Sequence, residues 1–227
     1  MNRSLRSALV GMVVGLALLG GGAAQANILY SSTQLFGAPL VGIGQDMTGR
    51  IQFEDFTLTA PATITNIRFW DSDFNASQGP STASIWWTVV SSPSSYPSGS
   101  IAGGTATSAY AGTGQSVTVG STTYYEHTND ISTSVTLGPG TYWLGLNNGS
   151  LAQETPDQFY WEQTTSYNGV PAFSYKLPSG PLGTVAHQRA IEVSGTETPE
   201  PATCVLLGAG LLGLIGRRRF ARKSGSR

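Results

Sequence analysis

The sequence predicts an all-β protein, a jelly-roll-like β-sandwich of about nine short strands flanked by an N-terminal signal helix and a C-terminal hydrophobic helix. Three observations favour this fold class. Segments rich in β-branched and aromatic residues recur along the chain, and clusters of Gly, Pro, Asn and Ser separate them. Between residues 27 and 195, no stretch has the periodicity of a long amphipathic helix.

The strands follow one another at short intervals. In chain order we expect them at IQFEDFTL (51–58), TITNIRFW (63–70), SIWWTVV (84–90), TTYYEH (122–127), SVTL (134–137), TYWLGLN (141–147), QFYWEQ (158–163), AFSYKL (172–177) and RAIEV (189–193). In the segment 141–147, Tyr142 and Leu144 alternate with Trp143 and Gly145, so one row faces a core and the other faces outward. The low-complexity stretch 91–115 instead predicts a long surface loop.

The N-terminus has the features of a secretory signal peptide. Arg3 and Arg6 precede an apolar run, residues 8–19, and the small-x-small sequence Ala24-Gln25-Ala26 follows. This order predicts a signal peptide over residues 1–26, cut by signal peptidase after Ala26. An uncleaved membrane anchor is the alternative interpretation.

The C-terminus combines three features in order. The turn Pro199-Glu200-Pro201 comes first, the uncharged stretch 202–216 follows, and a basic tail, 217–227, begins with Arg217, Arg218 and Arg219. As a helix, the stretch would be about 22 Å long, which suits a membrane if the arginines reach the headgroups and the bilayer thins. A buried core helix is less favoured because the stretch is apolar all round. We expect transient insertion, with the basic end in the cytoplasm.

This order of features resembles the PEP-CTERM sorting signal of bacterial surface and secreted proteins. The resemblance covers about 26 residues and implies processing by an exosortase, a membrane-embedded cysteine transpeptidase-like enzyme, at or near the Pro199-Glu200-Pro201 turn. Cys204 departs from the usual aliphatic residue; it is either a small apolar helix residue or a lipidation site. Residues 50–195 in turn resemble the β-sandwich ectodomain of exported PEP-CTERM proteins, which implies a fold and leaves the activity open.

The expected organisation is therefore a signal peptide (1–26), an ectodomain (27–195), and a short polar spacer followed by the sorting signal (196–227). We expect the protein at the bacterial cell surface or outside the cell, after transient anchoring in the inner membrane. The chain from 27 to 198 has 12 acidic against 4 basic residues, a net charge of −8, which argues against a nucleic-acid partner. The same segment has no cysteine, so no disulfide stabilises it.

The sequence does not predict an enzyme, because the common hydrolase, metalloprotease and nucleotide-binding motifs are absent. His127 stands near Glu126 and Asp130, but a solvated histidine at a strand end is the interpretation we favour. Glu54 and Asp55 are neighbours in a strand, so their carboxyl groups should face opposite sides rather than form a catalytic pair.

Two kinds of binding site stay open. Asp71, Asp73 and Asn75 are spaced as at the start of a Ca²⁺ loop, so Ca²⁺ is the one cofactor that the sequence suggests. The EF-hand pattern then fails, and a plain acidic turn is the alternative. Trp143 and Trp161 are candidates for stacking on a sugar, with core packing as the alternative. We expect a structural or interaction role at the cell surface. An exopolysaccharide-binding module that uses these tryptophans and the long loop is second, and a secreted enzyme is third.

Overall fold

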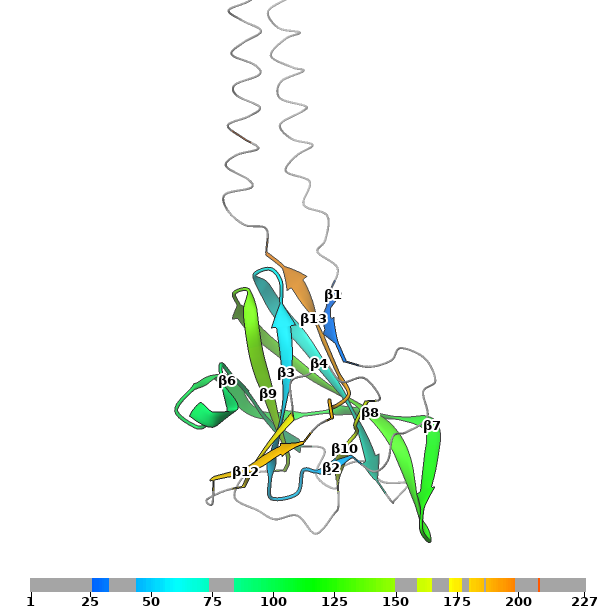
Figure 1. The fold of residues 1–227 in the computed structure, drawn as a ribbon. Helices are drawn as coiled ribbons and strands as arrows, with labels where there is room; N and C mark the ends of the chain where they lie inside the picture. The colour runs from blue at the N-terminus through cyan, green and yellow to red at the C-terminus, as the bar shows by residue number, and fades with distance from the viewer. Residues whose placement is uncertain are drawn as a thin grey trace, which may run out of the picture.

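Two antiparallel β-sheets form the body of the protein in the computed structural model (Figure 1). The structure describes residues 26–32, 44–73, 84–149, 159–164, 172–176, 180–185, 187–198 and 208. Its elements are β1 (Asn27–Ser31), β2 (Gln45–Asp46), β3 (Ile51–Leu58), β4 (Ala62–Asp73), β5 (Ser84–Val90), the 3-10 helix η1 (Pro93–Ser95), β6 (Ser100–Thr107), β7 (Ala109–Val119), β8 (Thr122–Leu137), β9 (Gly140–Asn148), β10 (Tyr160–Trp161), β11 (Ala172–Lys176), β12 (Gly180–Val185) and β13 (Ile191–Glu197).

The seven-stranded sheet is built on β4. β8 pairs with one edge of β4, and β7 pairs with β8. Along its other edge, β4 pairs with β13 and then with β10. β1 pairs with the far edge of β13, and β2 pairs with the far edge of β10. The six-stranded sheet has the order β12-β11-β3-β9-β5-β6. Two antiparallel sheets confirm the all-β sandwich, whereas its jelly-roll connectivity stays a prediction.

Several strands have the expected bounds, and others do not. β3 and β5 span the predicted residues, whereas the predicted strands 122–127 and 134–137 are parts of one long strand, β8. The long surface loop predicted for 91–115 is wrong: this stretch contains η1, β6 and most of β7. Its small Ser, Thr, Ala and Gly side chains do not predict a strand, but β5 and β8 supply the backbone pairing that makes it one.

The expected terminal helices lie almost wholly outside the described residues. In the part of the chain that the structure describes, no helix has the length and hydropathy needed to cross a membrane.

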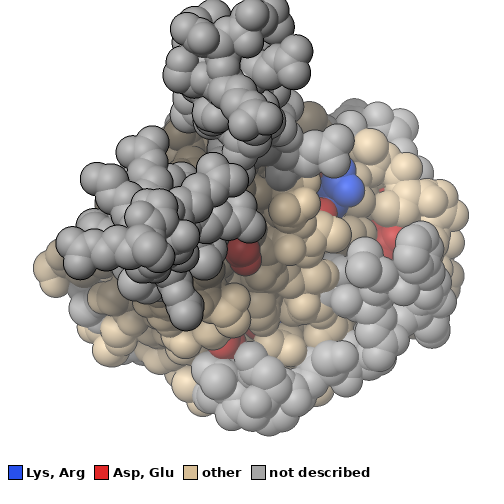
Figure 2. All heavy atoms as spheres, turned by 90° about the horizontal axis from the view of Figure 1, so that it is seen from above, with Lys and Arg blue, Asp and Glu red and all other residues tan. Residues whose placement is uncertain are grey.

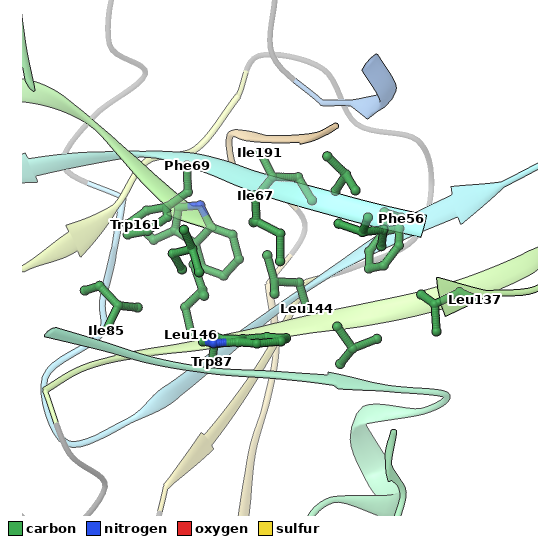
Figure 3. Packing of buried hydrophobic residues seen from close by; sticks show 14 of the residues in the cluster. Phe56, Ile67, Phe69, Ile85, Trp87, Leu137, Leu144, Leu146, Trp161 and Ile191 are labelled. Carbon is green, nitrogen blue, oxygen red and sulfur yellow. The ribbon is translucent and has the colours of Figure 1, made fainter. Parts of the chain in front are cut away.

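The core lies between the two sheets (Figure 3). Ile67 and Phe69 enter it from β4, and Phe56 and Leu144 enter it from the opposite sheet. The predicted alternation along 141–147 is confirmed, because Leu144 is buried in this core while Trp143 packs against a second cluster. The outer face of the six-stranded sheet therefore has apolar packing of its own.

Candidate functional site

The last strand of the sandwich runs directly into the expected processing motif. β13 pairs with β4 as far as Glu197, and the backbone N–H of Thr198 then donates a hydrogen bond to the carbonyl oxygen of Pro61 at 2.7 Å. Pro199 is the next residue. The strand thus continues two residues past the boundary expected at residue 195, and it includes most of the expected polar spacer.

Position 195 in this strand requires glycine. The register of β13 against β4 shifts between Ser194, which is opposite Asn66, and Gly195, which is opposite Ile64, so Thr65 of β4 is the extra residue at this irregularity. A Cβ at Gly195 would lie 2.1 Å from the carbonyl oxygen of Thr63, a distance that no side chain tolerates. Beyond this irregularity, residues 196–198 are half-buried or exposed, so Val193, which is fully buried, is the last apolar side chain that anchors the strand.

The expected start of the mature chain lies beside this strand. β1 pairs with β13 so that Asn27 is opposite Gly195. Ala26, which precedes Asn27, is exposed, and Ala24 lies outside the described residues. The two expected processing points are therefore next to the same pole of the sandwich (Figure 1). Figure 2 looks onto this pole from above, and its described side chains are mostly uncharged.

Aromatic side chains gather on the outer face of the six-stranded sheet. Tyr96, from the stretch expected to be a loop, is at the centre: its ring centroid lies 5.7 Å from that of Phe53, 5.8 Å from that of Trp86 and 5.2 Å from that of Tyr175. Trp143 packs against the same cluster. We call the half-buried rings of this cluster, Trp86, Trp143, Phe173 and Tyr175, the aromatic face.

Gly145 of β9 has no side chain, and this lets the aromatic cluster pack closely against the sheet. A Cβ at Gly145 would lie 2.5 Å from the ring of Phe53 and 2.9 Å from a methyl carbon of Thr88. Glycine therefore allows these two side chains to pack directly over the backbone of β9.

Trp161, the second tryptophan proposed for sugar stacking, is in the core instead. It is fully buried, its ring meets that of Phe69 edge-on at 6.2 Å, and its Nε1–H donates to the carbonyl oxygen of Ala190 at 2.9 Å. The guanidinium of Arg189 lies 5.5 Å from the centre of the ring. The proposed role of Trp161 in sugar binding is therefore wrong, because neither face of the ring is open to a ligand. Trp143, which is half-buried, retains that candidacy.

Two carboxyl groups meet on the outer face of the seven-stranded sheet. Glu126 of β8 and Glu162, just after β10, are hydrogen-bonded to each other. Ser72 donates to Oε1 of Glu162 at 2.5 Å, and Thr113 donates to Oε2 of Glu126 at 2.5 Å. Burial, together with the neighbouring carboxylate of Glu126, raises the pKa of Glu162 to about 9. Glu162 therefore keeps its proton at neutral pH and donates it to its partner.

A polar group also occupies the interior on the other side of β4. Asp71 accepts a hydrogen bond from the side-chain amide of Asn129, and Nδ1 of His127 lies 3.6 Å from its second oxygen. Burial raises the pKa of Asp71 to about 6. The expectation of a solvated His127 at a strand end is wrong: the histidine is 3 % exposed, because β8 continues well past it.

Two of the three residues expected to start a Ca²⁺ loop lie in a strand instead. Asp71 and Asp73 both belong to β4, where they lie on one face of the sheet and are buried. Asn75 lies outside the described residues. Among those that are described, no three His, Cys, Asp or Glu side chains are grouped as metal ligands.

A buried arginine links the two sheets. Arg189 donates its backbone N–H to Oε2 of Glu54 at 2.9 Å, and its guanidinium donates to Oε1 of Gln52 at 2.6 Å and to the carbonyl oxygen of Phe53. Burial raises the pKa of Glu54 to about 8 and lowers that of Arg189 to about 10. Asp55, opposite Trp143 in the register, faces the other side of β3, as predicted.

Comparison with known proteins identifies the C-terminal segment. Residues 197–219 match the protein-family description "PEP-CTERM protein-sorting motif", and the match begins at the last residue of β13. No curated protein matches the chain. The chain carries a PEP-CTERM sorting signal, which implies an exported protein that an exosortase processes and that is sorted to the cell surface.

Proposed function

We propose that this protein acts at the bacterial cell surface or in the extracellular matrix, where its acidic sandwich has a structural or binding role and no catalytic one. The observation that carries the proposal is that Thr198, which the folded domain still holds through its hydrogen bond to Pro61, already belongs to the sorting motif at residues 197–219. Such a chain consists of a folded domain to be exported and a sorting signal that follows it directly.

Export and sorting would involve two proteolytic cleavages of the chain. Signal peptidase removes residues 1–26 during export, and the apolar stretch 202–216 then holds the chain in the inner membrane, with Arg217, Arg218 and Arg219 at the cytoplasmic side. The exosortase next acts at or near Pro199-Glu200-Pro201 and removes the tail.

The state of the buried carboxyl groups supports a non-catalytic role. Glu54, Asp71 and Glu162 have strongly raised pKa values, a property that catalytic acids also show. Each of them, however, is at most 4 % exposed and is hydrogen-bonded inside the protein. Groups held in this way stabilise the packing of the sheets and present little surface to a substrate.

Replacement of the motif tests the sorting role. In the variant Pro199→Ala, Glu200→Ala, Pro201→Ala, we expect export and removal of the signal peptide to continue while the tail stays attached. Thr203→Ala, in the same tail, is the matched control and should be processed like the parent chain. Equal mature masses for the parent and the triple variant would contradict the proposal.

A second candidate function, carbohydrate binding, rests on the aromatic face. Of its four half-buried rings, Trp86 and Tyr175 meet Tyr96, and the other two pack against the same cluster on the outer surface of the sheet. Aromatic rings bind sugars by stacking. We expect Trp143→Ala to weaken binding of the purified protein to the exopolysaccharide of the producing bacterium. Trp70→Ala, which removes a half-buried tryptophan from the other sheet, is the control. Equal binding by both variants would eliminate this candidate.

A further inference from the structure

At its junction with the sorting motif, β13 is still paired with β4. Enzymes that cut a polypeptide need backbone that is accessible and free of other hydrogen bonds. Here the ladder between β13 and β4 continues to Glu197, and the N–H of Thr198 is bonded to Pro61. The residues directly before Pro199 are thus held by the sheet while the enzyme must approach from the membrane.

The end of β13 is nevertheless the weakest part of the strand. Ile191 and Val193 are fully buried in the core, whereas residues 196–198 bury no apolar side chain. The pairing of β1 with β13 ends at Gly195, so these three residues are held by β4 and its preceding residue Pro61. Gly195, where the register against β4 shifts, separates them from the anchored part, and glycine has the backbone freedom that a hinge needs.

We propose that this terminal segment, residues 196–198, is a gate for the exosortase: it must peel away from β4 about Gly195 before the tail can be removed. The proposal rests on the proposed function, since it concerns the same sorting motif. Opening would release three residues, which extend by about 10 Å. If opening and closing are fast relative to cleavage, the rate of tail removal follows the population of the open form.

Two variants change the gate in opposite directions. Insertion of Gly-Ser-Gly-Ser between Thr198 and Pro199 supplies free backbone beyond the last hydrogen bond, so the fold is unaffected and opening is no longer needed. The pair Thr63→Cys and Thr196→Cys, which are directly opposite in the register, locks the gate shut with a disulfide once the domain has crossed the inner membrane. Cys204→Ala is included in every chain, so that the native thiol cannot compete.

The measurement is a pulse-chase in the producing bacterium, with intact mass separating tail-bearing from processed chain. We expect the insertion to speed tail removal by about tenfold and the disulfide to prevent it, with a reducing agent restoring the rate. The insertion placed in the disulfide variant should also restore it. This rescue distinguishes a closed gate from a misfolded domain.

The Pro199→Ala, Glu200→Ala, Pro201→Ala chain separates the two proposals. If it keeps its tail while the insertion and the disulfide leave the rate unchanged, the gate is refuted and sorting stands. If it loses its tail like the parent chain, both proposals are refuted.

Discussion

Substitution of Glu162 by glutamine should make the protein more stable at neutral pH. The folded-state pKa of Glu162 is about 9 against an ordinary value of 4.5, so the folded chain keeps this proton to higher pH than the unfolded chain does. The free energy of unfolding is then highest below the ordinary pKa and falls as pH rises toward 9. Glutamine reproduces the protonated form, since its amide donates to Glu126 and its oxygen accepts from Ser72.

The size of the expected stability difference follows from the single proton that Glu162 holds in the folded state. A single shifted group changes the free energy of unfolding by about 1.4 kcal/mol for each pH unit between its two pKa values. Between about pH 5.5 and about pH 7.5, the parent chain should therefore lose about 3 kcal/mol relative to Glu162→Gln. Glu54 and Asp71 act in the same direction in both proteins, because their pKa values are raised to about 8 and about 6.

Urea unfolding at the two pH values, followed by tryptophan fluorescence, measures this difference. Glu197→Gln, which changes an exposed carboxyl group at the end of β13, is the control and should follow the parent chain. If the parent and Glu162→Gln lose stability in parallel, Glu162 does not hold a proton in the folded state, and the account of the carboxyl pair is wrong.

Three further substitutions test the packing by thermal or urea unfolding. Trp161→Ala should destabilise the protein by about 3–5 kcal/mol, because a fully buried ring is lost; a change near zero would place Trp161 outside the core. Arg189→Met should cost about 1–3 kcal/mol for each buried acceptor that loses this donor, namely Oε1 of Gln52 and the carbonyl oxygen of Phe53; an unchanged unfolding midpoint would show that these contacts contribute nothing. Gly145→Ala should destabilise because its Cβ would collide with Phe53, whereas Gly104→Ala, with no atom nearby, should not.

The sequence predicts those strands whose side chains carry the pattern themselves. β5 has β-branched or aromatic residues at six of its seven positions and β3 at four of its eight, and their bounds were predictable. The alternation of Leu144 with Trp143 likewise predicted the buried and the outer row of β9. The sorting signal was predictable because its three features follow one another within one segment.

Features that depend on pairing between distant strands could not be predicted. The segment that forms β6 consists of Ser, Ile, Ala, Gly and Thr, and it is a strand because β5 lies beside it. Glu126 and Glu162 are far apart in the sequence and meet only because β8 and β10 flank β4. For Trp161 the sequence left core packing and sugar stacking both open, and the register decides for the core because it places Trp161 next to Asp71, on the inner face of the sheet.

The meeting of Arg189 with Glu54 has the same origin. Arg189 lies just before β13 and Glu54 lies within β3, on opposite sheets, so a contact between the sheets brings them together. The available signal was a single basic residue at the start of the expected strand 189–193, and nothing in the sequence indicates its partner.

Intact mass of the protein recovered from the native cell surface and medium tests the central claim most directly. We expect a chain that begins near Asn27 and ends close to Pro199-Glu200-Pro201, with the apolar stretch and the basic tail removed. A mass that retains residues 202–227 would contradict this expectation, and the protein would then be an ectodomain that stays tethered to the membrane.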